Sequence, residues 1–545
     1  MLNHRRSLTN NGGRKTPGQG SRSKPVKRNR FGRGLLFQPR EPSQHEKLLA
    51  RCSEYLEVHC REVLAVGSGF RTEQRTEDLF LTYSNLFSPR NVRHAREAAD
   101  AFSGMPSKKF PERFDRLAWF LLEGLVSRKL AAHDDRIATA VCQAAINLDG
   151  KKLPCASLTV RLSQERDPAK REKLWSAYVA LVEEVLNPLL IERNKYFHKT
   201  LRRAGYETEA LFCQGRQQVD YGRLLEALNP VAAATDAVYA DATAKLIRRR
   251  LQLRFPGLSR AHEAYLLSLR EFDRSFPAGQ LRTVCQETCC GLGLDLGQTS
   301  SIRVDTEDRP TKDPVAFCVS IDPPREIHLV TRPRGGAEDY ASFLHEAGHA
   351  WFYACMSPKL PFEFRCLERS LALSETYAFL LEGLLQNEGW LTAVLGLDDA
   401  TASEVARRQK LADLYLLRRF IGKLEYELEF RKSPLDNWRN RFNYHHILSR
   451  RTGVDYDDAL YLLDMDRGFY TADYLRAWLA EAQMREHLET RFGRTWFRTP
   501  AAGQFLRELW SQGESWECEE MVSDALRCRA WDSAPLLRRF TGLGG

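Results

Sequence analysis

The stretch that decides the fold and the chemistry of this chain is Phe343-Leu344-His345-Glu346-Ala347-Gly348-His349-Ala350. Histidines four residues apart on a helix lie on one face, one turn apart. Two such imidazoles can reach one zinc ion, which binds histidine nitrogen at about 2.0–2.1 Å. The glutamate beside the first histidine then lies next to any water held on the metal and can accept its proton. The pattern therefore predicts a zinc site at His345 and His349, with Glu346 as its general base.

Two small residues, Ala347 and Gly348, stand inside this motif. Glycine costs a helix about 1 kcal/mol relative to alanine. A glycine kept at this position indicates that the metal helix packs closely against a neighbour.

A catalytic zinc site needs a third protein ligand, because three side chains and a water complete its coordination. The next predicted helix, residues 367–385, carries Glu368, Glu375 and Glu382 at intervals of seven and so on one face. One of them can bind the metal, and the others can orient the histidine rings by accepting hydrogen bonds from them. Spacing alone leaves Glu368 and Glu375 open as the ligand. Glu375 lies among apolar and small residues that suit the buried side of a helix, whereas Glu368 suits a solvated side.

Composition is that of a large globular protein, with 43% hydrophobic and 10% aromatic residues in a chain of 545. We expect one large helical unit or two to three subdomains. No run of 18 or more apolar residues occurs, so no membrane span is predicted. The 13 cysteines are odd in number and scattered, which favours reduced thiols and a cytoplasmic location.

The net charge of +10 belongs to one end of the chain. Residues 1–40 contain 11 Lys or Arg and no acid, so the remaining residues carry a net charge of −1. Residues 1–42 lack enough apolar surface to fold and are predicted to be a disordered basic tail. A nearly neutral body makes nucleic acid an unexpected partner, apart from weak contact through this tail.

The remainder divides at a change of texture near residue 300. Helical periodicity predicts an N-terminal helical lobe over residues 43–300, with helices at 44–66, 91–102, 110–129, 135–147 and 168–203. Residues 301–545 form the predicted catalytic lobe. It begins with short strands at 301–304, 316–320 and 327–331 and is otherwise helical. The strand at 326–331 could present a free edge to an extended peptide beside the metal helix.

Four parts of the chain resemble the thimet oligopeptidase and oligoendopeptidase F family of zinc metallopeptidases. The metal motif is the most specific. Glu375 and Glu382 match the family's ligand glutamate and the glutamate one heptad after it. The other two parts are the long helix, from Glu165-Arg166-Asp167-Pro168 to Ala204-Gly205-Tyr206, and the tyrosine segment Gly468-Phe469-Tyr470-Thr471-Ala472-Asp473-Tyr474.

The resemblance implies a mainly α, large two-lobed helical metallopeptidase fold with a small β region beside the metal helix and a deep cleft. It implies one zinc ion on His345, His349 and Glu375, with Glu382 behind the ligands. Tyr470 and Tyr474 would face the metal and stabilise the oxyanion of the reaction. The chain departs from the family at Met465, where a histidine is usual, and at Ala477, where a third tyrosine is usual.

The expected function is therefore zinc-dependent hydrolysis of peptide bonds in short unfolded oligopeptides, with Glu346 as the proton acceptor. The alternative is a catalytically silent helical binding or scaffold protein that keeps the peptidase fold. The altered tyrosine segment favours this alternative, and the intact His345, Glu346 and His349 oppose it.

Overall fold

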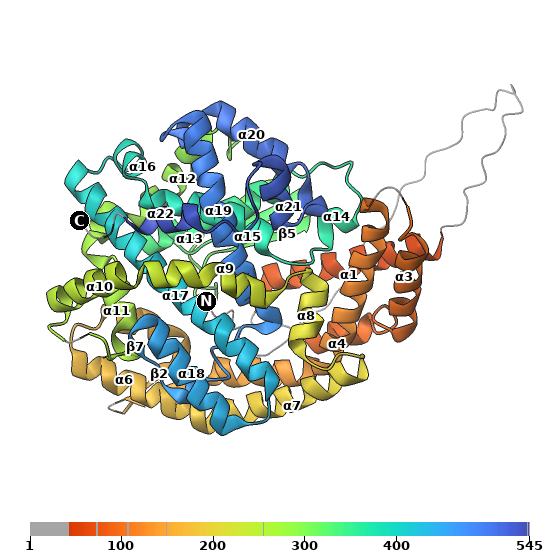
Figure 1. Cartoon of the computed structure of the whole chain (residues 1–545), viewed down its shortest axis with the longest axis horizontal. Coiled ribbons are helices and arrows are strands. Elements are labelled where there is room, and N and C mark those ends of the chain that lie inside the picture. Colours follow the sequence, from red (N-terminus) through yellow and green to blue (C-terminus); the bar gives the residue numbers. More distant parts are fainter. Residues whose placement is uncertain are drawn as a thin grey trace, which may run out of the picture.

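The protein is mainly helical, as the periodicity predicts (Figure 1). The computed structural model describes residues 43–545 except 72–74, 106–107, 149, 254, 542 and 544–545. The predicted basic tail, residues 1–42, lies outside the described residues.

The chain begins with helices that largely match the predicted ranges. α1 (Gln44–Gly67) starts at a capping box in which the Ser43 hydroxyl accepts from the Glu46 amide, and the Glu46 carboxylate accepts from the Ser43 amide. α2 (Thr76–Thr82) and α3 (Pro89–Ala101) follow. Two helices were predicted over residues 110–147, but the structure has one long helix, α4 (Lys109–Gln143), and then a hairpin of β1 (Ala145–Leu148) and β2 (Lys151–Pro154).

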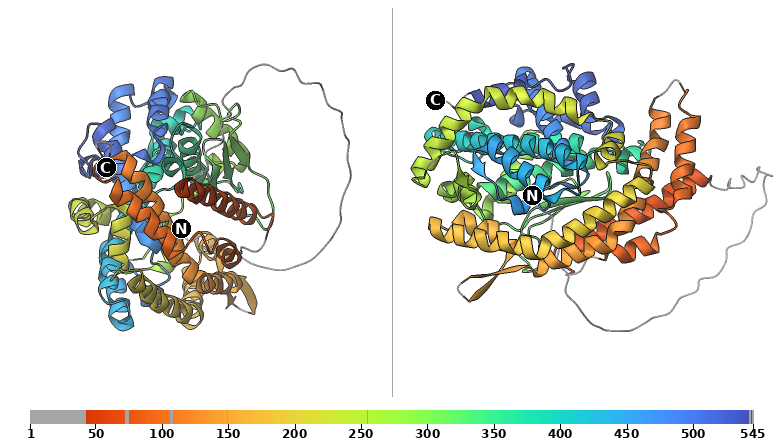
Figure 2. Two further views of the ribbon diagram at one scale, coloured as in Figure 1. Left: turned by 90° about the vertical axis from the view of Figure 1, so that its right-hand side faces the viewer. Right: turned by 60° about the horizontal axis from the view of Figure 1, so that its bottom comes forward.

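The predicted long helix over residues 168–203 is confirmed as α6 (Pro168–Leu181) and α7 (Asn187–Arg203), joined by a π-helical turn (Val182–Leu186). Asp167 caps its start with Pro168 at the first helical position, where the missing N–H is harmless. It runs along the outside of the molecule, orange to yellow in Figure 2. Among the described residues it is the one helix long and apolar enough to cross a membrane. This is weak evidence for a membrane span, because helices packed in soluble proteins share these properties.

Shorter helices lead to the sheet. They are α5 (Leu158–Gln164), α8 (Glu209–Gln217), α9 (Tyr221–Ala234), α10 (Asp236–Arg250), α11 (Glu263–Leu267) and α12 (Leu281–Gly291).

The predicted β region is confirmed as a three-stranded sheet, but its order overturns one expectation. β6 (Glu326–Val330) lies in the middle, parallel to β4 (Ile302–Asp305) and antiparallel to β5 (Phe317–Asp322). The strand expected to offer a free edge is therefore paired on both sides, and β4 and β5 form the edges instead. A short parallel pair, β3 (Leu258–Ser259) with β7 (Val454–Asp455), was not predicted.

The C-terminal half is helical. The metal helix is α13 (Ala337–Ala354), followed by α14 (Glu363–Cys366) and α15 (Ala372–Glu382). The later elements are α16 (Glu388–Ala393), α17 (Asp399–Lys432), α18 (Asn437–Thr452), α19 (Tyr470–Phe492), α20 (Pro500–Trp510), the 3₁₀ turn η10 (Gly513–Ser515), α21 (Cys518–Glu520) and α22 (Ala534–Thr541).

Buried apolar side chains form two cores. The larger joins α1–α11 to α17, α18 and part of α19, and the smaller surrounds α12, the sheet, α13 and α15. Helix α19 contributes Leu475 and Leu479 to the first core and Met484 and Leu488 to the second. The later helices therefore pack on both parts of the chain, and the predicted boundary near residue 300 stays a prediction.

Candidate metal centre

The metal helix α13 lies directly against α15, and a glycine permits the approach. A Cβ added at Gly348 would lie 2.6 Å from both the Cα of Ala378 and the carbonyl oxygen of Tyr377. Both are backbone atoms, which cannot move aside as a flexible side chain would. The small residue inside the motif therefore sets the spacing that brings Glu375 of α15 to the histidines of α13.

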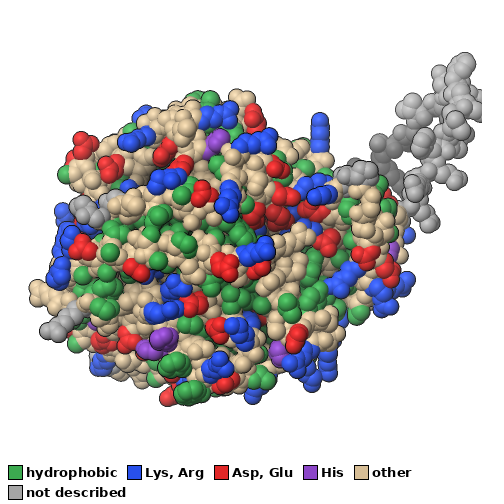
Figure 3. Space-filling view, in the orientation of Figure 1, with side chains coloured by type: hydrophobic (Ala, Val, Ile, Leu, Met, Phe, Trp, Pro, Cys, Tyr) green, Lys and Arg blue, Asp and Glu red, His purple; other side chains and the backbone are tan. Residues whose placement is uncertain are grey.

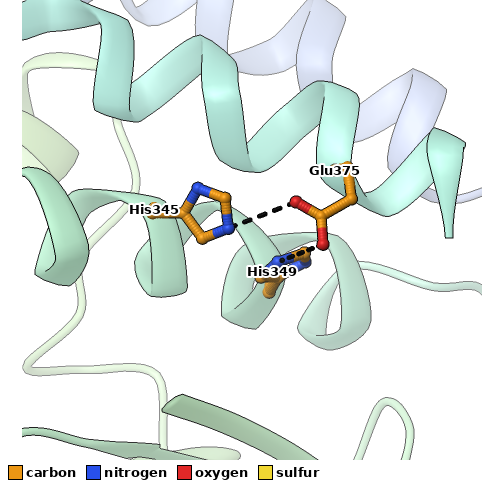
Figure 4. Close-up of side chains that lie close together, drawn as sticks. All are labelled: His345, His349 and Glu375. Atoms are coloured by element: carbon orange, nitrogen blue, oxygen red, sulfur yellow. Dashed lines mark ion pairs between the residues drawn. The ribbon is translucent and has the colours of Figure 1, made fainter. Parts of the chain in front are cut away.

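The three predicted ligands converge (Figure 4). The Nε2 of His345 lies 3.2 Å from Oε2 of Glu375, and the Nε2 of His349 lies 3.7 Å from Oε1 of the same carboxyl. Ligands at about 2.0–2.1 Å from a tetrahedral ion are separated by about 3.3 Å. The donor atoms thus have the separation that one small ion requires, and they all lie within 4.8 Å of one another.

The buried carboxyl of Glu375 fits a positively charged ligand. Its residue is 2% exposed, and its Oε2 has no hydrogen-bond partner among the described residues. Burial opposes ionisation, but His349 and His345 outweigh it and lower the pKa of Glu375. An ionised carboxylate beside two imidazoles is a donor set that a divalent ion satisfies, because zinc binds neutral imidazole and carboxylate oxygen.

The histidine rings are held in the orientations that ligands need. Glu382, one heptad after Glu375, accepts a hydrogen bond from Nδ1 of His345 at 2.8 Å, which leaves Nε2 directed at Glu375. Burial lowers the pKa of His349 to about 4, so this ring is neutral and can donate a lone pair. Burial acts in the same direction on His345, but the carboxylates of Glu375 and Glu382 reverse it and raise that pKa.

The predicted general base, Glu346, lies between the metal helix and the sheet. Burial raises the pKa of its carboxyl to about 7, against the opposing effects of His345 and of the backbone N–H of Cys318, which donates to it. Cys318 belongs to β5, an edge strand. A carboxyl with a pKa near 7 can both accept and return a proton at neutral pH.

Both predicted tyrosines lie beside the ligands. The hydroxyl of Tyr470 donates to Oε1 of Glu375, and the ring of Tyr474 lies 4.5 Å from that of Tyr470. Burial raises the pKa of both hydroxyls, so both keep their protons. Tyr474 also packs against Phe379 and Trp478, at 5.4 and 6.3 Å between ring centroids.

Of the two candidates for the third ligand, Glu368 and Glu375, the geometry favours Glu375. The helix predicted from residue 367 begins at Ala372, so Glu368 lies in the segment before it and does not share a face with Glu375 and Glu382. Among the described residues, Glu368 does not belong to the converging group. His445 is also apart from this group, because it lies on α18 and contacts the Tyr456 carbonyl.

Two aromatic residues next to the ligands were missed in the sequence. The ring of Phe379 meets that of His345 at 5.4 Å, edge to face, and Tyr353 stacks over His349 at 6.5 Å. Each follows a ligand by four residues, Phe379 after Glu375 and Tyr353 after His349. Since residues four apart share a helical face, this spacing could have identified both.

Comparison of the whole chain with models of known protein families gives no match, and comparison with curated proteins gives none. The resemblance to the thimet oligopeptidase and oligoendopeptidase F family therefore remains a prediction from motifs. Inferences about function rest on the site itself.

Proposed function

We propose that this protein is a zinc-dependent metallopeptidase that hydrolyses peptide bonds of short unfolded oligopeptides. The observation that carries the proposal is the convergence of His345, His349 and Glu375 within 4.8 Å, with the carboxyl of Glu346 on the same helix as the histidines. Two imidazoles and one carboxylate are a ligand set of catalytic zinc sites, which keep one position open.

The residues present fit zinc, because Glu375 has an unpartnered buried oxygen and His349 is neutral. Zinc would supply Lewis-acid chemistry, polarising a carbonyl and acidifying water. His345 and His349 would hold it through Nε2 and Glu375 through its carboxylate, while Glu382 keeps His345 in position.

Glu346 would move the proton. Its pKa near 7 allows the carboxylate to take a proton from the attacking water and to return it to the leaving amine. The edge strand β5 supports this role, since the Cys318 amide fixes the carboxyl by a hydrogen bond.

Tyr470 and Tyr474 would stabilise the oxyanion of the tetrahedral intermediate. Both hydroxyls are protonated and lie on the Glu375 side of the histidines, where they can donate to a developing negative charge. One such donor is worth about 3–4 kcal/mol in other enzymes.

A two-lobed fold with a deep cleft would restrict access to short unfolded chains. Support comes from Glu368, which is exposed to solvent although charged groups of the first and second halves of the chain surround it.

The test compares wild-type protein with Glu346→Gln for bound metal and for cleavage of a quenched peptide library. We expect zinc in both and cleavage at least about 100-fold slower in the variant, because general bases contribute about 10²–10⁴. Zinc without cleavage in the wild type would favour the silent binding or scaffold protein. Absence of zinc from the wild type would refute the metal site.

A further inference from the structure

The segment between α14 and α15 is hydrogen-bonded to α4 and to α19, and it leaves the side chain of Glu368 exposed. Arg116 of α4 donates to the Leu367 carbonyl, Arg476 of α19 donates to the Ser370 hydroxyl, and the Leu371 amide donates to Asp473. Leu367, Arg369 and Ser370 are buried, whereas Glu368 is exposed. Its position is therefore fixed by its neighbours, although its carboxyl has no ion-pair or hydrogen-bond partner among the described residues.

Glu368 is exposed to solvent but enclosed by the protein. The charges that act on it belong to Arg216 of α8, Asp473 of α19, and Glu123 and Arg116 of α4. The charge of Glu368 in turn raises the pKa of Cys60 of α1, of Tyr353 of α13 and of Glu514 of η10. Groups from six elements therefore lie around a side chain that is exposed to solvent. We call Glu368, Glu514, Glu123 and Asp473 the acidic pocket.

The pocket has more carboxyl groups than cationic side chains. Four nearby arginines each hold carboxylates already, Arg116 with Glu112 and Glu517, Arg216 with Glu123, Arg369 with Asp115, and Arg476 with Asp473 and Glu519. Those pairs use every arginine named, and among the described residues Glu368 and Glu514 have no ion-pair partner. Figure 3 shows acidic side chains gathered on this face around α21.

Glu514 is an independent indication that the pocket suits a cation. It is 3% exposed, and its Oε1 has no hydrogen-bond partner among the described residues. Burial and then Glu368 raise its pKa, and burial raises the pKa of Glu368 to about 7 with Asp473 and Glu123 adding to it. Carboxyls that resist ionisation beside one another gain most from a positive charge brought between them.

The acidic pocket borders the metal centre. Tyr353 stacks over His349 on one side, and its hydroxyl is influenced by Glu368 and Glu514 on the other. One helical turn, from His349 to Tyr353, covers about 6 Å. Tyr353 is therefore a neighbour of both sites.

The pocket suits an organic cation better than a bare metal ion. Within the described residues, three donor atoms converge within 4.8 Å at His345, His349 and Glu375, but the pocket's carboxyls form no such group. Carboxylates supplied by several elements match the larger size and several donors of an ammonium or guanidinium group.

We propose that the acidic pocket binds a positively charged group of the peptide substrate near the cleaved bond, with Glu368 as the contacting residue and Glu514 behind it. This inference rests on the proposed function for the position of the bond. The cation is either the side chain of arginine or lysine or the free amino terminus.

The test measures binding to full-length Glu346→Gln protein loaded with zinc, by fluorescence anisotropy. Three labelled peptides share one sequence. The first is acetylated and carries arginine, the second is acetylated and carries neutral citrulline in its place, and the third carries citrulline with a free amino terminus. We expect the first or the third to bind at least about tenfold more tightly than the second, and which one does so identifies the source of the cation.

Adding Glu368→Gln or Glu514→Gln to the Glu346→Gln protein should remove most of its preference for the cationic peptide. Adding Glu226→Gln, which changes an exposed carboxyl on α9, should preserve that preference. Circular dichroism and thermal melting check that each variant folds. Equal binding of all three peptides, no binding at all, or a preference that survives both substitutions would overturn the inference. The proposed function is judged separately, since a wild-type protein that binds the cationic peptide but cleaves none of the three supports the pocket and refutes the peptidase.

Discussion

The metal centre and the acidic pocket share Tyr353 as a neighbour and are built from different lengths of chain. The metal centre takes its donors from α13 and α15, which follow one another closely in the sequence. The acidic pocket takes its carboxyls from Glu123 on α4, Glu368 before α15, Asp473 on α19 and Glu514 in η10.

The two sites also differ in how their charges are balanced. In the metal centre two imidazoles accompany a single ionised carboxylate, and their donor atoms are close enough for one small ion. In the acidic pocket two carboxyls have no ion-pair partner among the described residues, and the carboxyls belong to separate elements. The comparison teaches that dense, mixed donors suit a metal, whereas dispersed, like-charged carboxyls suit a larger cation.

The largest expected effect is on zinc affinity, which should distinguish the metal centre from the acidic pocket. Glu375→Ala removes a donor, so we expect zinc affinity to fall by more than about 100-fold, beyond the 10–100-fold that outer hydrogen bonds contribute. Glu368→Ala should leave it unchanged. Competition with a chelating dye measures both. Loss of zinc in Glu368→Ala with retention in Glu375→Ala would show that Glu368 is the metal ligand. The metal centre and the acidic pocket would then not be separate sites.

A second effect concerns the orientation of His345. Glu382→Gln weakens the hydrogen bond to Nδ1, and we expect zinc affinity to fall by about 10–100-fold. Glu388→Gln, on the neighbouring α16, is the matched control. An unchanged affinity in Glu382→Gln would show that packing against Phe379 alone holds the ring.

The third effect tests the close approach of α13 and α15. Gly348→Ala places a methyl group 2.6 Å from backbone atoms of α15, so we expect the free energy of unfolding to fall by about 1–3 kcal/mol. Zinc affinity should fall as well, while the cation preference of the pocket persists. Gly279→Ala is the control, because a Cβ there meets nothing within 4 Å. Chemical denaturation compares the variants, and equal stability would contradict the close contact.

The smallest effect is the pH dependence of stability at the pocket. The raised pKa of Glu514 means that the folded protein keeps this proton at pH values where the unfolded chain, with the ordinary value of 4.5, has lost it. Its contribution therefore destabilises the fold as pH rises above about 4.5. Glu514→Gln removes this contribution.

We expect the melting temperature of Glu514→Gln, relative to wild type, to be about 1–2 °C higher at pH 8 than at pH 5. Differential scanning calorimetry at both pH values measures it. A difference of opposite sign would mean that Glu514 is ionised in the folded protein and already balanced by Arg116, so a cation in the pocket would gain little from it.

Sequence patterns were most informative where the interactions are local. Helical spacing placed His345 and His349 on one face, and the interval of seven placed Glu375 and Glu382 together on α15. The same spacing misplaced Glu368, because periodicity extended the helix past its start at Ala372, where side chains of α4 and α19 hold the preceding segment in another conformation. The order of the sheet was also beyond local patterns, since pairing of β6 with β4 and β5 depends on contacts between segments distant in sequence.

By itself the sequence determined a mainly helical chain, a short β region, and a metal-binding motif with its base, because these depend on residues within a few turns of one another. Only the tertiary structure decided that Glu375 meets both imidazoles, that Tyr470 contacts Glu375, and that Glu368 lies among charged groups from separate parts of the chain. The physical reason is that burial and charge at each of these groups are set by neighbours from other elements, which spacing along the chain does not reveal.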